Sequence, residues 1–401
     1  MTGVRILAGY PEGGLQALVR RLNEVGELEK IIAPSRAINR AAGAILKSVG
    51  IDSMSGRLSR GLPDLPALHE VLPAYEPLRM LSRLSRGIGG AAIEATLKAW
   101  FDASSSRVKG SSSAVVGLPG AALLNFGLPG DRLKVLHQVD GHPNERNAAL
   151  SRFYGARARS EMFSRQAIDR IARELELADL VLSPSSVVTT GLCRSGVAPA
   201  KIAQHYYGVD LTRFGGRLAP GVRSHSGRPR AVYVGQVSYR KGFPFLLEAA
   251  RRSTVDVDVV GPVLERNLIK RLPDNMSYHG VVSHEAVARL MASADAFVIA
   301  SVEDACPLVV FEAAASGLPV IATDACGSAE ALIPEDVDVV QAGDSASLAA
   351  ALSRVARQDL AAREARSLRF RGAIGNASAL TDWTGWSDWV RTEISQRVAE
   401  R

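Results

Sequence analysis

The chain has 401 residues and a formal net charge of +7, with 47% hydrophobic and 22% charged residues. This length suits two globular domains, and this composition argues against extensive disorder. The three cysteines are too few for a disulfide framework or a thiolate metal cage, and no apolar stretch approaches the eighteen or so residues of a membrane span. We therefore expect a cytoplasmic protein. Its basic charge would suit a phosphate-bearing substrate or an anionic membrane surface, and nucleic acid ranks last because the basic residues lack interleaved aromatic ones.

The first half of the chain predicts a doubly wound α/β domain. Four β-rich runs, separated by long helical tracts, cover residues 4–9, 113–118, 134–139 and 179–184. Gly13 and Gly14 follow the first run and precede a helical stretch, where they would let a phosphate or a sugar approach the backbone. They lack a dinucleotide fingerprint, and a mere turn is the alternative.

Residues 78–86, LRMLSRLSR, form a basic helical pattern. On a helix, Arg79, Arg83 and Arg86 would share one side and could meet anionic lipid headgroups together. This pattern predicts peripheral contact with the inner face of the cell membrane. A solvated helix face that lines an acceptor cleft is an equally good interpretation.

At residues 137–142, HQVDGH, a predicted strand ends in two histidines and an aspartate. His142 or Asp140 would suit a proton acceptor or a polar wall for the hydroxyl group of an acceptor, and we slightly favour His142. His137 lies inside the strand pattern and is expected to be a structural histidine.

From residue 231 onward, short β-rich runs alternate with helical patterns, which predicts a second parallel sheet covered on both faces. Residues 215–230 are rich in Gly, Pro and Arg and indicate a link between two domains. Near the C-terminus, Trp383, Trp386 and Trp389 would lie on one side of a helix that packs back onto the first domain. We expect domain ranges of 1–207, 208–375 and, for this helix, 376–401.

The segment GQVSYRKG at residues 235–242 follows a predicted strand and opens a helix, so it is a candidate phosphate site. Gly235 and Gln236 begin this segment, and Arg240 and Lys241 would supply cations for phosphate oxygens. Asp256 and Asp258 of the next strand lie at its start, away from the ligand-binding end of the sheet. They are expected to be exposed strand residues rather than metal ligands.

The segment at residues 303–317, EDACPLVVFEAAASG, also follows a predicted strand of this sheet. Pro307 suits the first helical position, so Asp304 would precede the helix and Glu312 would lie in its apolar middle. Burying an unpaired carboxylate costs several kcal/mol, and a ligand with hydroxyl groups would provide partners. Alternatively, Asp304 is a helix cap and Glu312 a core carboxylate paired within the protein.

Three stretches resemble the retaining GT-B glycosyltransferases of family four. They are ADLVLSPSSVVTTGL with AQHYYGVDLTRF, YVGQVSYRKGFPFLLEA, and SVEDACPLVVFEAAASGLPVIATDACGSAE. The resemblance implies two Rossmann-like doubly wound domains that face a central cleft, with the C-terminal helix crossing back to the first domain.

The resemblance also implies roles for individual residues. Glu312 would bind the nucleotide ribose, Asp304 the donor sugar, and Arg240 or Lys241 the diphosphate. The backbone of the segment that joins Asp304 to the helix would support the leaving group; its residues are Ala305, Cys306, Pro307 and Leu308. This chain departs from the family pattern at two positions. Asp304 stands in place of the commoner glutamate, and Gln236 stands where many members carry a phosphate-binding arginine, whose role Arg240 would have to take over.

The resemblance implies an enzyme that moves a hexose from a UDP- or GDP-sugar to a glycan or lipid-linked acceptor in polysaccharide biosynthesis, with retention of configuration. Electrostatic stabilisation of the diphosphate would need neither a metal nor another cofactor. The alternative is a nucleotide-sugar-binding partner subunit with weak catalytic activity. A nucleotide-sugar epimerase is disfavoured by the spacing of Asp304 and Glu312.

Overall fold

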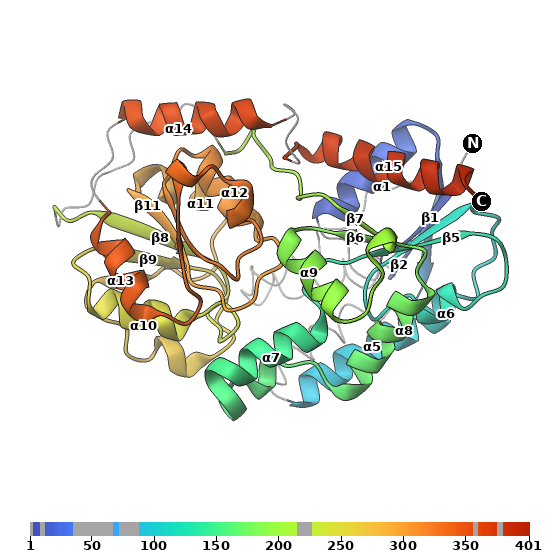
Figure 1. The fold of residues 1–401 in the computed structure, drawn as a ribbon, viewed down its shortest axis with the longest axis horizontal. Coiled ribbons are helices and arrows are strands. Elements are labelled where there is room, and N and C mark those ends of the chain that lie inside the picture. The colour runs from blue at the N-terminus through green and yellow to red at the C-terminus, as the bar shows by residue number, and fades with distance from the viewer. Residues whose placement is uncertain are drawn as a thin grey trace, which may run out of the picture.

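The structure is a computed structural model, and it describes residues 3–8, 13–34, 67–71, 88–214, 227–355, 360–374 and 380–401. Within these ranges, two parallel sheets of seven and six strands form the centres of two lobes (Figure 1). The basic segment at residues 78–86, with Arg79, Arg83 and Arg86, lies outside the described residues. In the described part of the chain, no helix is both long and apolar enough to cross a membrane.

The N-terminal lobe is built on the sheet β3-β2-β1-β4-β5-β6-β7, in which every neighbouring pair is parallel. Its strands are β1 (Val4–Leu7), β2 (Leu28–Pro34), β3 (Leu68–Val71), β4 (Ala114–Gly117), β5 (Leu133–His137), β6 (Leu180–Ser183) and β7 (Ile202–Gln204). Its helices are α1 (Gly13–Glu24), α5 (Ile88–Ser105), α6 (Leu123–Phe126), α7 (Pro143–Tyr154), α8 (Arg165–Leu177) and α9 (Ser186–Arg194), with the 3₁₀ helices η1 (Gly155–Glu161) and η2 (Pro199–Lys201). The four β-rich runs of the first half are confirmed as strands.

The C-terminal lobe is built on the parallel sheet β10-β9-β8-β11-β12-β13. Its strands are β8 (Arg230–Val234), β9 (Asp256–Val260), β10 (Met276–Tyr278), β11 (Ala296–Ile299), β12 (Val320–Thr323) and β13 (Val337–Val340), and its helices are α10 (Phe243–Arg251), α11 (His284–Ser293), α12 (Leu308–Ala315), α13 (Ser345–Ser353) and α14 (Leu360–Ala373). Three 3₁₀ helices complete it, η3 (Arg266–Ile269), η4 (Ala329–Ala331) and η5 (Pro334–Asp336). The chain winds outward in opposite directions from β8 and β11, so the crevice where such sheets bind ligands lies at their carboxyl ends.

The C-terminal helix α15 (Trp383–Ala399) returns to the N-terminal lobe and lies beside α1 (Figure 1). Trp386 is 1% exposed within the core formed around β1 and β4, and Trp383 and Trp389 pack against the same core. Arg21 of α1 donates to Asp388 of α15 over 2.8 Å. The predicted packing of the three tryptophans on the first domain is thereby confirmed, whereas the domain boundaries after residues 207 and 375 stay a prediction.

The two segments that join the lobes lie side by side. Gly208 and Val209 follow β7 and run parallel to residues 381–383, with a backbone bridge between Val209 and Asp382. The Val209 N–H donates to the Thr381 carbonyl over 3.2 Å. A side chain at position 208 would meet the backbone of Asp382 and Trp383 at 2.6 Å, so only glycine allows this approach.

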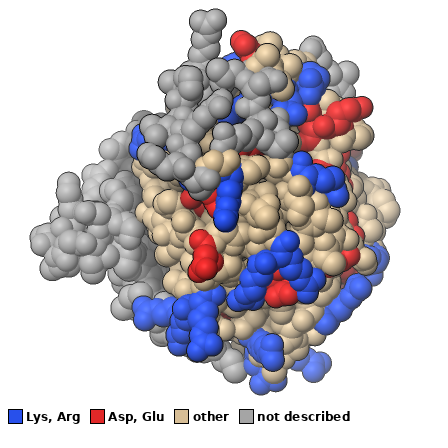
Figure 2. Space-filling view, turned by 90° about the vertical axis from the view of Figure 1, so that its left-hand side faces the viewer, with Lys and Arg blue, Asp and Glu red and all other residues tan. Residues whose placement is uncertain are grey.

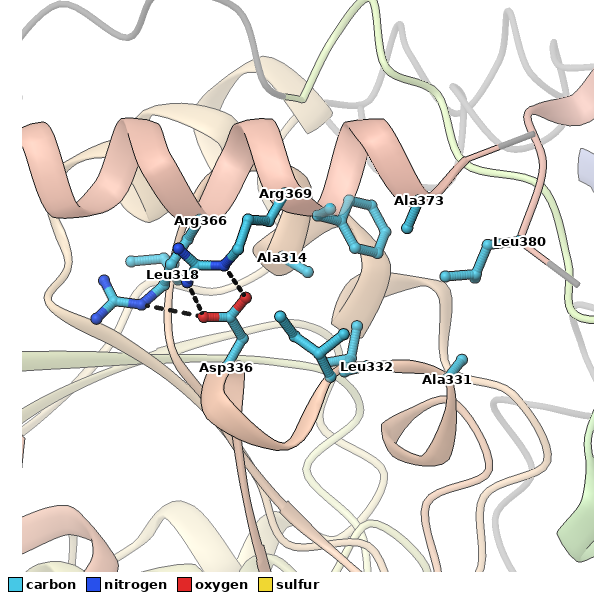
Figure 3. A pocket seen from close by; sticks show the side chains of 11 residues that line it. Ala314, Leu318, Ala331, Leu332, Asp336, Arg366, Arg369, Ala373 and Leu380 are labelled. Carbon is cyan, nitrogen blue, oxygen red and sulfur yellow. Dashed lines mark hydrogen bonds and ion pairs between the residues drawn. The ribbon is translucent and has the colours of Figure 1, made fainter. Parts of the chain in front are cut away.

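Helix α14 lies along the outer side of α11 and α12 and bounds a small cavity (Figure 3). The cavity is mostly apolar, with side chains of Leu332 and Phe370 in its wall, and Asp336 at its edge receives hydrogen bonds from Arg369 over 2.5 Å and 3.3 Å. Arg363 of α14 donates to the carbonyls of Met291, Ala292 and Ala294 at the end of α11. These contacts fix α12 from behind and leave its other end facing the crevice.

Basic side chains also gather on the outer face of the C-terminal lobe, with acidic ones between them (Figure 2). At the C-terminal end of α10 in the same lobe, Arg252 lies 2.7 Å from Glu248, and the two side chains are 53% and 41% exposed. Such pairs are worth little individually. This part of the basic charge is therefore a solvated face.

Candidate functional site

The loops that follow β8 and β11 meet at the carboxyl ends of these neighbouring strands. The Val302 N–H donates to the Arg240 carbonyl over 2.9 Å, and the Lys241 ammonium pairs directly with Asp304. Ser301 completes the contact by donating to Asp304 over 2.9 Å. The structure thus brings Arg240, Lys241 and Asp304 together at the crevice.

Gly242 is what lets the phosphate-loop candidate turn into α10. It caps the helix with φ of 63° and ψ of 21°, in the left-handed region that favours glycine, and a Cβ there would collide with the Ala300 carbonyl. Pro244 then occupies the first turn of α10, where its missing N–H costs nothing. The loop is therefore held tightly between β8 and β11, with Lys241 and Arg240 at its tip.

Asp304 is 5% exposed and lies between two cations. Burial alone would raise its pKa, but Lys241 and then Arg240, whose guanidinium is 3.7 Å away, lower the pKa of Asp304 below its ordinary value. Burial lowers the pKa of Lys241, and the Asp304 charge opposes that change. Asp304 is therefore an anion held in place by Lys241 at the base of the crevice.

Helix α12 begins at Leu308, one residue later than predicted, because Pro307 is extended with ψ of 111°. Ala305 and Cys306 are buried in the preceding loop. The Ala305 carbonyl accepts a 2.6 Å hydrogen bond from Ser185, which caps α9 of the N-terminal lobe. The segment from Ala305 to Leu308 thus lies where the two lobes meet, while its role in supporting a leaving group stays a prediction.

Glu312 projects from an otherwise apolar face of α12 and is partly buried. Among the described residues, no side chain or backbone group forms a hydrogen bond or ion pair with its carboxylate. Burial raises the pKa of Glu312 to about 7, opposed by Arg213 and assisted by Asp210. The alternative of an internally paired core carboxylate finds no partner in the described part of the chain.

This raised pKa gives a pH-dependent prediction. A ribose hydroxyl donates best to an ionised carboxylate, so the affinity for a nucleotide sugar is expected to rise by about tenfold between pH 6 and pH 8 as Glu312 loses its proton. The same shift means that the ligand-free protein loses stability as the pH rises through 7, because the folded form binds this proton more tightly than the unfolded form. Calorimetric titration of UDP-glucose and GDP-mannose across this range measures the effect. An equal pH dependence in Glu312→Gln would contradict it.

On the opposite side, His142 and Asp140 have different surroundings. His142 is 4% exposed and caps α7, with Nδ1 accepting from the Asn144 N–H over 3.2 Å. Burial lowers the pKa of His142, so it is neutral at pH 7. The Asp140 side chain is 42% exposed, and although burial would raise its pKa, Arg146 and Arg240 lower the pKa of Asp140 to about 2. Asp140 is thus the more exposed of the two side chains, and which of them faces an acceptor stays a prediction.

His137 has the structural role expected of it. The ring is 3% exposed, lies 3.2 Å from the Tyr207 hydroxyl, and packs 5.3 Å from the Trp386 ring. Burial lowers the pKa of His137 to about 4.

Three functional candidates escaped the sequence reasoning. Glu303, directly before Asp304, is 8% exposed and accepts from Arg146 of α7 over 2.9 Å. Glu161 at the end of η1 accepts from the N–H groups of Tyr239 and Arg240 over 2.7 Å and 2.9 Å. The sequence offered a signal for Glu303, because it is an acidic residue directly before Asp304. It offered no such signal for Arg146 or Glu161.

Two other expectations concerned glycines and the aspartates of β9. Gly14 is the second residue of α1, and a Cβ there would lie 3.1 Å from the Trp383 ring, which gives the glycine a packing role. Donor binding by Gly13, Gly14, Gly235 and Gln236 stays a prediction.

The expectation that Asp258 is exposed was wrong, because it is 5% exposed and pairs with Arg230 over 3.0 Å and with His279 over 2.7 Å. Among the described residues, no group of three or more His, Cys, Asp or Glu side chains could hold a metal ion.

Comparison with solved structures defines the class of fold. HepE of Anabaena, in complex with UDP and glucose, superposes with a TM-score of 0.64 at 17% identity, covering 99% of this chain and 100% of that one. This likeness shows the fold. The two facing parallel α/β lobes are those of the GT-B glycosyltransferases, as predicted.

Sequence comparison gives a family match to part of the chain. Residues 228–358 match the family described as Glycosyl transferases group 1. The GDP-mannose-dependent alpha-mannosyltransferase of Mycobacterium tuberculosis is 31% identical over 166 residues, which cover 39% of this chain and 42% of the relative. The putative colanic acid biosynthesis glycosyltransferase WcaL of Salmonella typhimurium is 29% identical over 206 residues, covering 45% and 48%. The chain thus matches less than half the length of these curated relatives.

Proposed function

We propose that the protein is a nucleotide-sugar-dependent hexosyltransferase that retains the anomeric configuration. The observation that carries the proposal is the cluster at the carboxyl ends of β8 and β11, where Arg240 and Lys241 lie beside Asp304. The carboxylate of Glu312, which has no partner among the described residues, follows on α12. A diphosphate, a sugar and a ribose are the three parts of a donor that this order of charges would bind.

The donor base stays open between two classes. The mannosyltransferase relative uses GDP-mannose by its name, and HepE was solved with UDP and glucose. Both support a nucleoside diphosphate joined to a hexose. By its name, WcaL is a putative glycosyltransferase of colanic acid biosynthesis, which supports a role in polysaccharide biosynthesis. A glycan or lipid-linked acceptor stays a prediction. A cytoplasmic location with peripheral contact at the inner membrane face stays a prediction.

In the proposed reaction, the bond between the anomeric carbon and the diphosphate oxygen breaks while the acceptor oxygen bonds to the anomeric carbon on the same face of the sugar. The proton of the acceptor hydroxyl passes to the departing diphosphate. Arg240 and Lys241 would stabilise the negative charge that develops on the departing diphosphate. Asp304 would accept a hydrogen bond from a sugar hydroxyl, and its ion pair with Lys241 fixes both groups before the donor arrives. Asp140, on the facing lobe, would orient the acceptor hydroxyl.

Replacing Glu312 by glutamine tests the donor site. We expect the fold to persist and the affinity for the bound nucleotide sugar to fall by about 1–3 kcal/mol, because a charge-assisted hydrogen bond to the ribose is lost. The measurement is calorimetric titration with UDP-glucose and GDP-mannose. Glu248→Gln on α10 is the matched control, since that side chain is 41% exposed and pairs with surface arginines. Equal affinity in Glu312→Gln and wild type would remove Glu312 from the site.

A binding subunit with weak transfer activity is the second candidate. It is favoured by Gln236, a neutral residue where the resembling enzymes carry an arginine, and by the engagement of Lys241 with Asp304. Donor hydrolysis separates the two functions. Release of free UDP or GDP from a bound nucleotide sugar supports the transferase, and tight binding without release supports the subunit.

A further inference from the structure

Arg146 of α7 joins two carboxylates that belong to different lobes. Its Nη2 lies 2.7 Å from Asp140 of the N-terminal lobe, and its Nε donates to Glu303 of the C-terminal lobe over 2.9 Å. Arg146 is 9% exposed and Glu303 is 8% exposed. Charges removed from water to this extent interact strongly, and the loss of one leaves the other uncompensated.

The backbone next to Asp140 is fitted to this contact. A Cβ added to Gly141 would lie 2.5 Å from Glu303 Oε1, so the loop approaches the carboxylate as closely as a residue without a side chain allows. Gln138 holds the same loop by donating to the Asp140 carbonyl over 2.7 Å. The contact between the lobes is therefore built from both sides.

Glu303 also faces the cation of the phosphate-loop candidate. Arg240 Nη1 lies 3.6 Å from the Glu303 carboxylate and donates to the Glu303 carbonyl over 3.4 Å. These distances are longer than the 2.9 Å from Arg146. Arg146 thus engages the carboxylate more closely, and the Arg240 guanidinium has weaker partners to leave when an anion competes for it.

We propose that Arg146 is a positioning residue that couples the acceptor side of the cleft to the donor side. By binding Glu303 it ties the two lobes together, and it keeps that carboxylate from capturing Arg240, which remains available for the diphosphate. Without Arg146, Glu303 turns to Arg240 and weakens stabilisation of the leaving group. This inference rests on the proposed function for its effect on turnover, but the tie between the lobes does not depend on it.

The tie between the lobes is tested on the full chain without any ligand. Thermal unfolding is measured for wild type, Arg146→Gln, Glu303→Gln and the double variant, with Arg194→Gln as control. Arg194 of α9 pairs over 2.7 Å with Glu145, which lies on α7 next to Arg146. The Arg194 side chain is 63% exposed, and both residues of this pair belong to the N-terminal lobe. We expect each single change at the tie to lower the midpoint more than the control does, and the double change to lower it by less than the sum. Additive shifts would overturn the tie.

The positioning role is tested by kinetics with the nucleotide sugar, UDP-glucose or GDP-mannose, that wild type consumes. Arg146→Gln is expected to lower kcat by about tenfold or more with a change in donor KM of less than about threefold. Adding Glu303→Gln should restore part of kcat, since the neutral amide no longer captures Arg240. A double variant as slow as Arg146→Gln would overturn the role. If Arg146→Gln fails to fold, Arg146→Lys replaces it in both the thermal-unfolding and the kinetic comparison, alone and combined with Glu303→Gln.

The two failures are distinguishable. If wild type neither binds nor consumes any nucleotide sugar, the proposed function fails, and the thermal-unfolding comparison still decides whether Arg146 and Glu303 couple the lobes. If wild type turns over a donor but the double variant shows no recovery, the proposed function stands and the positioning role fails.

Discussion

Changing both Arg240 and Lys241 to alanine is expected to lower the turnover of the nucleotide sugar by about 10²- to 10³-fold. Each is a charged donor at the place where the diphosphate would leave, and losing one preorganised electrostatic group in an active site commonly costs about this much. The measurement is the initial rate of UDP or GDP release at saturating donor. Unchanged kinetics would move the phosphate site to another part of the cleft.

The experiment must separate an effect on turnover from an effect on stability, because Lys241 is also the partner of the buried Asp304. Its removal strips Asp304 of its nearest cation and is expected to lower stability as well. Arg240→Ala separates the two effects, since Lys241 remains in place. The matched double control is Arg251→Ala with Arg252→Ala, two arginines of the same lobe that are 49% and 53% exposed.

Trp386→Ala is expected to lower the free energy of unfolding by about 3–5 kcal/mol, the range for truncating a large buried aromatic side chain. The indole is 1% exposed, and its ring lies 5.8 Å from that of Tyr207 and 5.9 Å from that of Trp383. Its loss leaves a cavity where α15 meets the N-terminal lobe. Chemical denaturation measures the change.

Trp100→Ala on α5 is the control for this prediction, because the Trp100 side chain is 48% exposed. It should lose far less stability than Trp386→Ala. Equal losses in the two variants would show that the C-terminal helix contributes little to the N-terminal lobe.

The buried strands could be predicted from sequence because both faces of a parallel sheet are covered, which leaves continuous apolar runs. The pattern fails for β2, β3, β7, β10 and β13, which carry partly exposed side chains. Their pairing depends on the neighbouring strand rather than on their own residues. The burial of Asp258 on β9 could not be predicted for a related reason. Its charge is buried because Arg230 and His279 of neighbouring segments pair with it.

The contact of Arg240 and Lys241 with Asp304 was predictable because these groups follow strands whose carboxyl ends must meet. The contact between Arg146 and Glu303 was not, because these residues are 157 positions apart and meet through the packing of one lobe on the other. The same holds for Glu161 and the N–H groups of Tyr239 and Arg240. No spacing within one segment encodes such contacts.

The paired crossing at Val209 and Asp382 limits how the lobes can move. A single tether would permit the lobes to bend, twist and slide, whereas two tethers joined by a backbone bridge resist twisting and sliding and leave bending as the soft motion. Under the proposed function, closing on a donor would then remove little orientational freedom. Gly208, where the two backbones approach, would thus act on affinity through the entropy of the unliganded protein without touching any ligand.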